Sequence, residues 1–196
     1  MSNHTCILQQ SFYEQPTLSL ARNLLGKILV HETEEGVTSG VIVETEAYLG
    51  ETDRAAHSYQ KRRTKRTEIM FHSPGHVYIY QMHGHHLINV VAGEVGNPQA
   101  VLIRALEPQE GIPLMKNRRP VDKLINLTNG PGKLTKAFGI TKADYGRTFF
   151  ERPLYIMEGS LPADISVGSR IGIDNSGLAK DYPYRFWVSE NPFVSR

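Results

Sequence analysis

The segment from Val37 to Tyr48 constrains the fold more than any other, because it predicts a long β-strand with two chemically different faces. With a side-chain period of two, one face carries Val41, Val43, Thr45 and Ala47, and the other carries Ile42, Glu44, Glu46 and Tyr48. Two carboxylates and a tyrosine are an unusual load for so apolar a strand. The face with Glu44, Glu46 and Tyr48 is therefore expected either to meet solvent or to form a pocket with a carboxylate at its floor.

Short apolar runs bounded by turn residues predict the remaining strands. These runs cover residues 27–31, 76–82, 101–105, 154–157, 170–173 and 186–189, and Glu34-Glu35-Gly36 forms the turn before the long strand. Two helices are predicted. One follows Pro16-Thr17 and ends at Gly26, and the other is entered at Asn129-Gly130-Pro131-Gly132, runs through Lys133 and ends near Gly139. Many short strands with few helices indicate an α+β fold on an antiparallel or mixed sheet, not a doubly wound fold.

Length and composition are those of one ordinary globular domain. The chain has 196 residues, 40% of them hydrophobic and 21% charged, and no repeat or linker divides it, so a single domain over residues 1–196 is predicted. No apolar run approaches the ~20 residues that span a bilayer, and the segment from Met1 to Cys6 lacks the order of a signal peptide. Cys6 is the only cysteine, which excludes an internal disulfide and favours a reducing, cytoplasmic location.

A cluster of cations stands out in a nearly balanced charge distribution. The formal net charge is only +2, but Lys61, Arg62, Arg63, Lys65 and Arg66 follow one another closely. Such a density favours contacts with phosphates, although a solvated basic loop would have the same composition. The cluster therefore permits a nucleic-acid partner without requiring one.

The strand predicted over residues 76–82 adds a second polar face. His76, Tyr78 and Tyr80 would share this face because side chains alternate along a strand. If the strand lies near residues 37–48, its aromatic side chains and the carboxylates could enclose one pocket.

Five histidines between His72 and His86 suggest a rival chemistry. His83 and His85 would share a strand face, as metal ligands often do, and Glu94 could complete the site. A metal-dependent hydrolase is therefore an alternative hypothesis, although no Cys or clustered Asp supports it.

Five blocks of sequence follow one another along nearly the whole chain. The blocks are Ile42-Val43-Glu44-Thr45-Glu46-Ala47-Tyr48-Leu49-Gly50 with Ala55-Ala56-His57-Ser58, Pro74-Gly75 with Val77-Tyr78-Ile79-Tyr80, Leu102-Ile103-Arg104-Ala105-Leu106-Glu107-Pro108, Asn129-Gly130-Pro131-Gly132-Lys133-Leu134, and Arg185-Phe186-Trp187-Val188. In this order they resemble the alkyladenine (3-methyladenine) DNA glycosylase family. The resemblance implies one domain with a curved, mainly antiparallel sheet, an open-barrel-like core similar to the C-terminal domain of formyltransferases, and peripheral helices. It implies neither a metal ion nor an organic cofactor.

The resemblance also implies a catalytic group. Glu46 would be the general base that activates water against C1′ of a flipped nucleotide. Arg104 and the backbone carbonyl of Ile171 would hold that water. No lysine falls at the matched pocket positions, so the expected reaction is hydrolysis of the N-glycosidic bond without strand cleavage.

Other matched positions would bind the substrate. Tyr48, His57 and Tyr80 would enclose the flipped base, with Ala55 and Asn89 as further contacts. A base within the stack is unreachable, so such an enzyme must extrude it, and aromatic faces suit the cationic ring of a purine alkylated at N3 or N7. The implied substrates are 3-methyladenine, 7-methylguanine, ethenoadenine and hypoxanthine in duplex DNA, and a monomer is expected.

A third set of residues would contact DNA outside the pocket. The set comprises His83, Gly84, Lys61, Arg62, Arg63 and Lys133. His83 takes the position of a family tyrosine that wedges into the gap left by the flipped nucleotide, within a stretch one residue shorter than usual. Because an imidazole is smaller than a phenol, it should wedge less well.

A second alternative is a catalytically silent DNA-binding module, in which the basic cluster binds and Glu46 is incidental.

Overall fold

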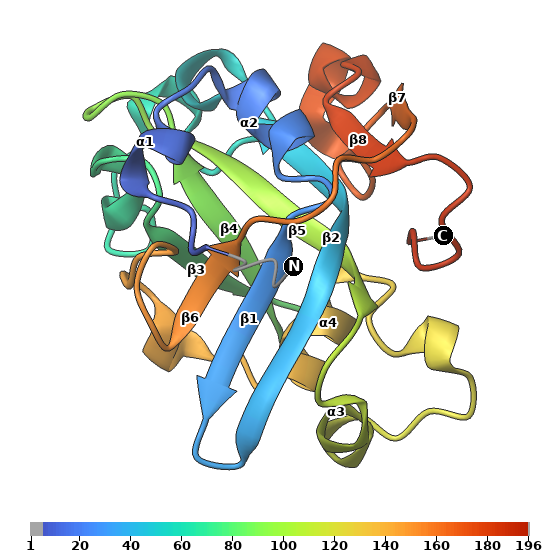
Figure 1. Ribbon diagram of the computed structural model, residues 1–196. Coiled ribbons are helices and arrows are strands. Elements are labelled where there is room, and N and C mark those ends of the chain that lie inside the picture. The colour runs from blue at the N-terminus through green and yellow to red at the C-terminus, as the bar shows by residue number, and fades with distance from the viewer. Residues whose placement is uncertain (1–5, 196) are drawn as a thin grey trace.

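The structure, a computed structural model that describes residues 6–195, is organised around one antiparallel sheet (Figure 1). Its strands are β1 (Ile28–Thr33), β2 (Gly36–Tyr48), β3 (Val77–Met82), β4 (His85–Ala92), β5 (Gln99–Pro108), β6 (Leu154–Met157), β7 (Ile165–Gly168) and β8 (Arg185–Val188). Six strands follow the order β3-β4-β5-β2-β1-β6, while β8 pairs with β2 and β7 pairs with β8. The sheet curls into an open half barrel, which confirms the predicted α+β class with a curved antiparallel sheet.

Short helices connect the strands. The α-helices of the described chain are α1 (Gln10–Tyr13), α2 (Thr17–Asn23), α3 (Ile112–Arg118) and α4 (Pro131–Phe138). The 3-10 helices are η1 (Gly50–Thr52), η2 (Tyr59–Lys61), η3 (Glu68–Phe71), η4 (Leu124–Asn126), η5 (Lys142–Asp144) and η6 (Asp174–Asp181). The two predicted helices are confirmed as α2 and α4. In α4, Pro131 occupies the first turn, and Gly139 ends the helix with a φ of 67° that glycine adopts without steric cost.

The hydrophobic core joins the inner side of the sheet to α2 and α4. Leu20 of α2 and Leu24, which follows it, belong to the same buried cluster as Leu134 and Phe138 of α4 and Ile103 of β5. The spacing of Leu134 and Phe138 places both on one side of α4, as expected for an amphipathic helix against a sheet. One continuous core thus supports the strands from which the polar side chains of β2 project.

The pairing of β2 with β5 is irregular in its central part. The register shifts between Ile42 and Glu44 and again between Glu44 and Thr45. The pairing leaves Val43 of β2 and Arg104 of β5 without a partner directly opposite. Each is an extra residue of the kind that forms a β-bulge and redirects neighbouring side chains.

This irregularity corrects one sequence-based expectation. Ile42 was predicted to share a face with Glu44 and Glu46, but it packs in the core cluster with Ala47. Thr45 also points to this side, since its hydroxyl donates to the carbonyl of Ala21 at 2.8 Å. The simple alternation is therefore wrong at Ile42, because the bulge reverses the side on which the following residues project.

Several other elements differ from the expectations. Strands β4 and β7 and helices α1 and α3 were not predicted, and β5 extends well beyond residues 101–105. The strand predicted over residues 170–173 is wrong, because Gly172 has a φ of 76° and the chain turns there into η6. Hydrogen bonds of the Arg170 side chain, described below, hold this segment instead of a strand ladder.

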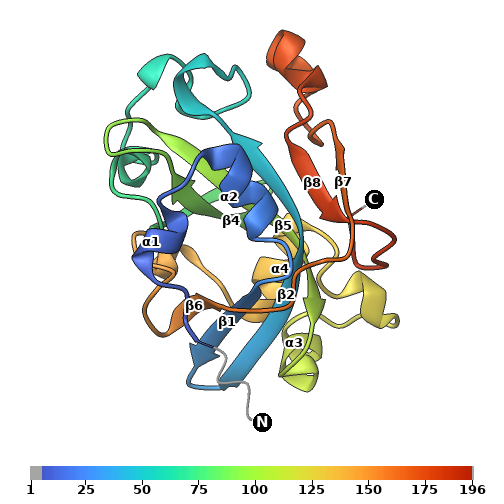
Figure 2. The same cartoon turned by 45° about the horizontal axis from the view of Figure 1, so that its top comes forward.

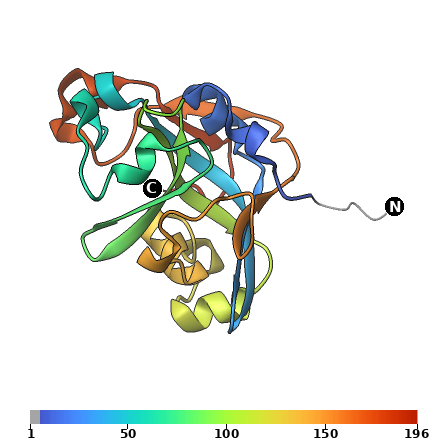
Figure 3. The ribbon, with the colours of Figure 1, turned by 90° about the vertical axis from the view of Figure 1, so that its left-hand side faces the viewer.

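Two groups of loops rise beside the C-terminal end of β2. Figure 2 shows the teal loops and short helices that follow β2 on one side and η6, drawn in red, on the other. The hairpin of β3 and β4, green in Figure 3, extends away from the rest of the sheet. These three features surround the region where the candidate site lies.

Residues 1–5, whose sequence lacks the pattern of a signal peptide, lie outside the described residues. Within residues 6–195, no helix combines the length and the apolar character that a membrane crossing would need.

Candidate active site

A cavity of about 350 Å³ lies beside the C-terminal end of β2. It is lined by Tyr48, Ala55, His57, Met70, Tyr78, Tyr80, Met82, Leu87, Asn89, Ala100, Leu102, Arg104, Pro131, Ile171, Gly172 and Ile173. A larger hollow of about 810 Å³ lies between α1, the start of α2 and residues 93–99, but its carboxylates, Glu14 and Glu94, are exposed. The smaller cavity is the better candidate because buried charged groups and several aromatic rings converge on it.

Glu46 lies behind the wall of this cavity, with its side chain fully buried. Its Oε1 accepts the Ile171 N–H at 2.7 Å, its Oε2 accepts the Tyr48 hydroxyl at 2.8 Å, and Arg104 Nη1 lies 3.4 Å from Oε1. Burial raises the pKa of Glu46 above its usual value, and the Arg104 charge, the Ile171 N–H and the Tyr48 hydroxyl oppose this rise. The carboxylate is therefore a stronger base than an exposed glutamate and is held in a fixed orientation.

Glu44 is also fully buried on β2, and of its partners only Arg104 lines the cavity. Its Oε1 accepts the Nε–H of Arg104 at 3.0 Å and that of Arg185 at 2.7 Å. Ser195 adds two more bonds, from its N–H at 2.7 Å and its hydroxyl at 2.8 Å. Glu44 is thus a structural anchor that holds one side of Arg104.

Arg104 joins the two carboxylates and also lines the cavity. Burial lowers the pKa of Arg104, but the charges of Glu46 and Glu44 outweigh this, so the pKa lies above its usual value and the guanidinium stays cationic. The bulge in β5 occurs at this residue, a common place for bulges beside active sites. Its predicted place in the site is consistent with this geometry, and its role with water stays a prediction.

Aromatic rings form another part of the cavity lining. The ring of His57 meets that of Tyr80 edge-on at 4.5 Å between centroids, and its Nδ1 lies 2.8 Å from the Tyr78 hydroxyl. Burial, together with the nearby charges of Arg66 and Arg62, lowers the pKa of His57 to about 4. His57 is therefore neutral at pH 7 and adds no charge to the cavity.

The other predicted substrate contacts also reach the cavity. Ala55 and Asn89 line it, and the Asn89 side-chain amide donates to the carbonyl oxygens of Tyr78 at 3.2 Å and Leu87 at 3.4 Å. Ile171 lines it as well and contributes its N–H to Glu46. The role predicted for the Ile171 carbonyl, that of holding water, stays a prediction.

His83 and Gly84 form the tip of the β3–β4 hairpin. Both are exposed and have positive φ angles, 49° and 80°, as a two-residue hairpin turn requires. Met82, which precedes them, lines the cavity and is 45% exposed. The tip therefore projects next to the cavity mouth, a suitable position for a wedge.

The basic cluster is divided by its ion pairs. Arg63 is held by Glu68, with Nε and Nη2 contacts of 2.9 and 2.5 Å, and Lys61 lies 3.4 Å from Glu51. Arg62 forms no ion pair with any described residue, and the same holds for Arg66, which sequence analysis did not assign to the site. Since the charge of Arg66 affects the pKa values of Tyr78, Tyr80 and His57, Arg62 and Arg66 are the better candidates for phosphate contacts near the cavity.

Lys133 lies in the first turn of α4. Its Nζ donates to Asn129 Oδ1 at 2.8 Å, and Arg119 is close enough to lower its pKa, although burial contributes more. Pro131 of the same turn lines the cavity. A phosphate contact by Lys133 stays a prediction.

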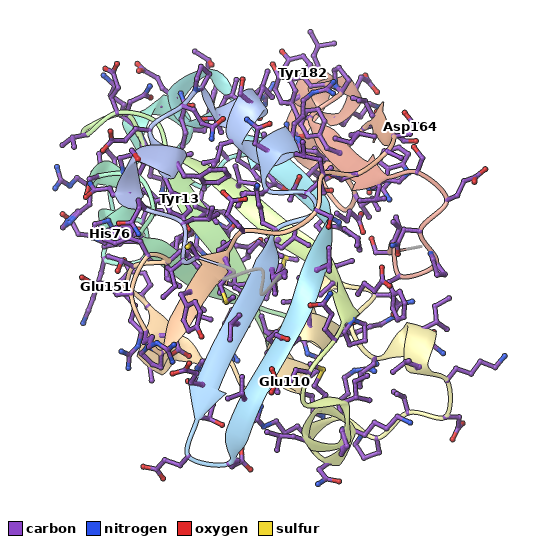
Figure 4. The ribbon with its side chains drawn as sticks, in the orientation of Figure 1. Tyr13, His76, Glu110, Glu151, Asp164 and Tyr182 are labelled. Carbon is purple, nitrogen blue, oxygen red and sulfur yellow. The ribbon has the colours of Figure 1, made fainter. Side chains whose placement is uncertain are left out.

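The structure does not favour the histidine-based metal site. His85 begins β4, whereas Glu94 follows its far end, a separation of roughly 25 Å along an extended strand. His76 lies at the edge of the molecule (Figure 4) and does not line the cavity. The centroid of its ring is 5.7 Å from that of His72. Across residues 6–195, no three His, Cys, Asp or Glu side chains gather as a metal site would require.

Sequence analysis missed a buried ion pair behind the site. The side chains of Arg170 and Asp53 are 0% and 1% exposed, and their Nη1–Oδ2 and Nη2–Oδ1 distances are 2.5 and 2.8 Å. Neither residue lines the cavity. The two lie 117 residues apart, and no local pattern signals that they meet.

Comparison with known proteins is consistent with this geometry. Residues 11–192 match the family model described as methylpurine-DNA glycosylase. A relative in Oceanobacillus iheyensis is 64% identical over 189 residues, or 96% of each chain, and one in Bacillus subtilis is 62% identical over 186 residues, or 95% of each chain. A Listeria monocytogenes relative is 49% identical over 191 residues, covering 96% of this chain and 92% of its own. All three bear the name "Putative 3-methyladenine DNA glycosylase". The chain thus belongs to the methylpurine-DNA glycosylase family.

Proposed function

We propose that the protein is a monofunctional DNA glycosylase that extrudes alkylated or deaminated purines from duplex DNA and hydrolyses their N-glycosidic bond. Its substrate class would include 3-methyladenine, 7-methylguanine, ethenoadenine and hypoxanthine. It would act as a monomer in the cytosol and start base excision repair.

The observation that carries this proposal is the buried carboxylate of Glu46 behind an aromatic cavity. A charge removed from water is costly unless hydrogen bonds and opposite charges compensate it. Glu46 has three such partners, Arg104 and Ile171 at its Oε1 and Tyr48 at its Oε2, and all three line the cavity. A water molecule at this wall would be within reach of both the carboxylate and a nucleotide in the cavity.

The reaction follows from this placement. Glu46 would accept a proton from the water as the water oxygen bonds to C1′ of the sugar. The bond from C1′ to the base nitrogen breaks, and the base leaves with the electron pair of that bond. The negative charge of Glu46 would also stabilise the positive charge that develops at the sugar.

The cavity wall supports a purine with a weakened glycosidic bond. The aromatic side chains of Tyr48 and Tyr80 line the cavity, and a purine alkylated at N3 or N7 carries a positive charge that π-electrons attract. Such a base is also a good leaving group. The lining described above contains no lysine, which supports hydrolysis by water and not an amine nucleophile.

A DNA-binding module without catalysis is the second candidate. It would need only the basic residues and the hairpin tip, and Glu46 would be an ordinary structural carboxylate. Glu44 serves as an example of a structural carboxylate in this protein, since three of its four bonds come from Arg185 and Ser195, which do not line the cavity. Glu46 differs because its partners lie on the cavity wall.

The first prediction concerns Glu46→Gln. The amide keeps the size of the side chain but cannot accept the proton of water, so single-turnover base release should fall by ~10²–10⁴, while affinity for lesion DNA persists. Glu94→Gln, in the larger hollow, is the matched control and should retain wild-type activity. Glu44→Gln is a poor control, because it would weaken a buried network and release Arg104. Wild-type rates in Glu46→Gln would refute the catalytic assignment.

The second prediction concerns the hairpin tip. His83→Asn should raise the dissociation constant for lesion DNA more than for undamaged DNA, because it removes the ring that would fill the gap. Asparagine tolerates a positive φ, so the turn itself should survive. His83→Tyr should bind lesion DNA at least as tightly as wild type, because its ring is larger. If neither variant changes the ratio of the two dissociation constants, the tip is not a wedge.

The third prediction concerns the basic cluster. Arg62→Ala and Arg66→Ala should each reduce the slope of log K against log[salt] by about 0.9 if each side chain contacts one phosphate. Arg152→Ala, an exposed arginine paired with Glu32 near β6, is the matched control and should leave the slope unchanged. If the slopes of Arg62→Ala and Arg66→Ala equal that of wild type, the cluster is a solvated basic loop and does not contact phosphates.

A further inference from the structure

The buried ion pair of Asp53 and Arg170 has more partners than a simple stabilising contact needs. Each oxygen of Asp53 accepts one guanidinium N–H and one backbone N–H, the latter from Leu49 and Ala55, both at 3.0 Å. Asp53 therefore holds the loop after β2 at two points: Leu49, where the loop begins, and Ala55, which lines the cavity. This loop also carries His57.

Arg170 extends the same network to the opposite side. Its Nη1 donates to the carbonyl of Ala47 at 2.9 Å, and its Nη2 donates to that of Ala179 in η6 at 3.1 Å. Its guanidinium carbon lies 4.7 Å from the centroid of the Tyr48 ring and 5.3 Å from that of Tyr184. One side chain thus fixes the end of β2, the segment before η6 and the ring of Tyr48.

Two of these groups act directly on Glu46. Tyr48 donates its hydroxyl to Oε2, and Ile171, the residue that follows Arg170, donates its N–H to Oε1. Both donors are therefore placed by Arg170, one through ring contact and the other through the backbone.

We propose that the Asp53–Arg170 ion pair is a positioning unit for Glu46, which fixes the two donors that orient its carboxylate. The proposal rests on the proposed function, because it assigns a role toward the general base. Neither residue would touch the substrate, so both are positioning residues.

A positioning role has a distinctive dependence on pH. Charged or titratable groups that face Glu46 are Arg104 of β5, Tyr48 and Glu44 of β2, and Tyr80 of β3, while Arg185 of β8 acts through Glu44. Tyr48 depends on its contact with Arg170. The other groups are not partners of the ion pair and should remain in place when Asp53 is changed. Loss of the Ile171 N–H would remove one of the contacts that lower the pKa of Glu46, so that pKa would rise further.

The sign of the effect follows from the base role. Glu46 must be ionised to accept a proton, so activity falls as pH drops through its pKa. A higher pKa in the variant moves this fall to higher pH. Above both pKa values, the carboxylate is ionised in either protein, so the difference in rate is smallest there and reflects only the orientation of the carboxylate.

The test is the pH profile of single-turnover base release for wild type, Asp53→Asn and Arg170→Lys, at pH values where circular dichroism shows each protein folded. We expect the acid limb of both variants to shift upward by about one pH unit, a tenfold loss on that limb, with recovery at high pH. Lys27→Met is the control: it breaks a different ion pair, between the buried Lys27 and the half-exposed Glu158 at 2.5 Å, and should leave the limb unchanged. If Asp53→Asn does not fold, Arg170→Lys carries the test.

Other outcomes separate the two proposals. A constant loss of rate at every pH, or a limb that moves equally in Lys27→Met, would overturn the positioning role and leave a structural one. Glu46→Gln is measured in parallel. If Glu46→Gln is as active as wild type, Glu46 is not the general base and the proposed function is contradicted. If Glu46→Gln is inactive but the acid limbs of Asp53→Asn and Arg170→Lys do not shift, only the positioning role is contradicted.

Discussion

The site depends on the burial of two carboxylates, Glu44 and Glu46, on one strand of a curved sheet. Two buried negative charges so close together would be unstable without compensation. Arg104 lies between them, with Nε on Glu44 and Nη1 near Glu46. The other partners of the two carboxylates differ. Glu44 is bound by Arg185 and Ser195, whereas Glu46 is bound by Tyr48 and Ile171 at the cavity wall.

The fold provides this arrangement through irregular features of an otherwise regular sheet. The register shifts between β2 and β5 place Arg104 next to both carboxylates, and β8 pairs with β2 to bring Arg185 to Glu44. The segment after β7 turns at Gly172 instead of continuing as a strand, which brings Ile171 to Glu46. The core formed by α2, α4 and the sheet supports these elements from behind.

Much of this could be predicted from the sequence, and the failures have physical causes. A period of two placed Glu46 and Tyr48 on one face, and the resemblance to a known family led to Arg104, His57 and Tyr80. The reversal at Ile42 could not be foreseen, because a bulge depends on the partner strand and not on local sequence. The partnership of Asp53 and Arg170 was also hidden, since it is made by tertiary folding between distant segments.

The ionisation of Glu46 itself tests the central claim most directly. The carbon-13 resonances of labelled glutamate carboxyl groups can be followed by NMR from acid to neutral pH, with Glu46→Gln identifying the signal of Glu46. The account predicts that this carboxyl titrates above the usual value of 4.5 and that its midpoint coincides with the acid limb of single-turnover base release. A carboxyl that stays ionised well below this value, or a midpoint unrelated to the rate, would contradict it.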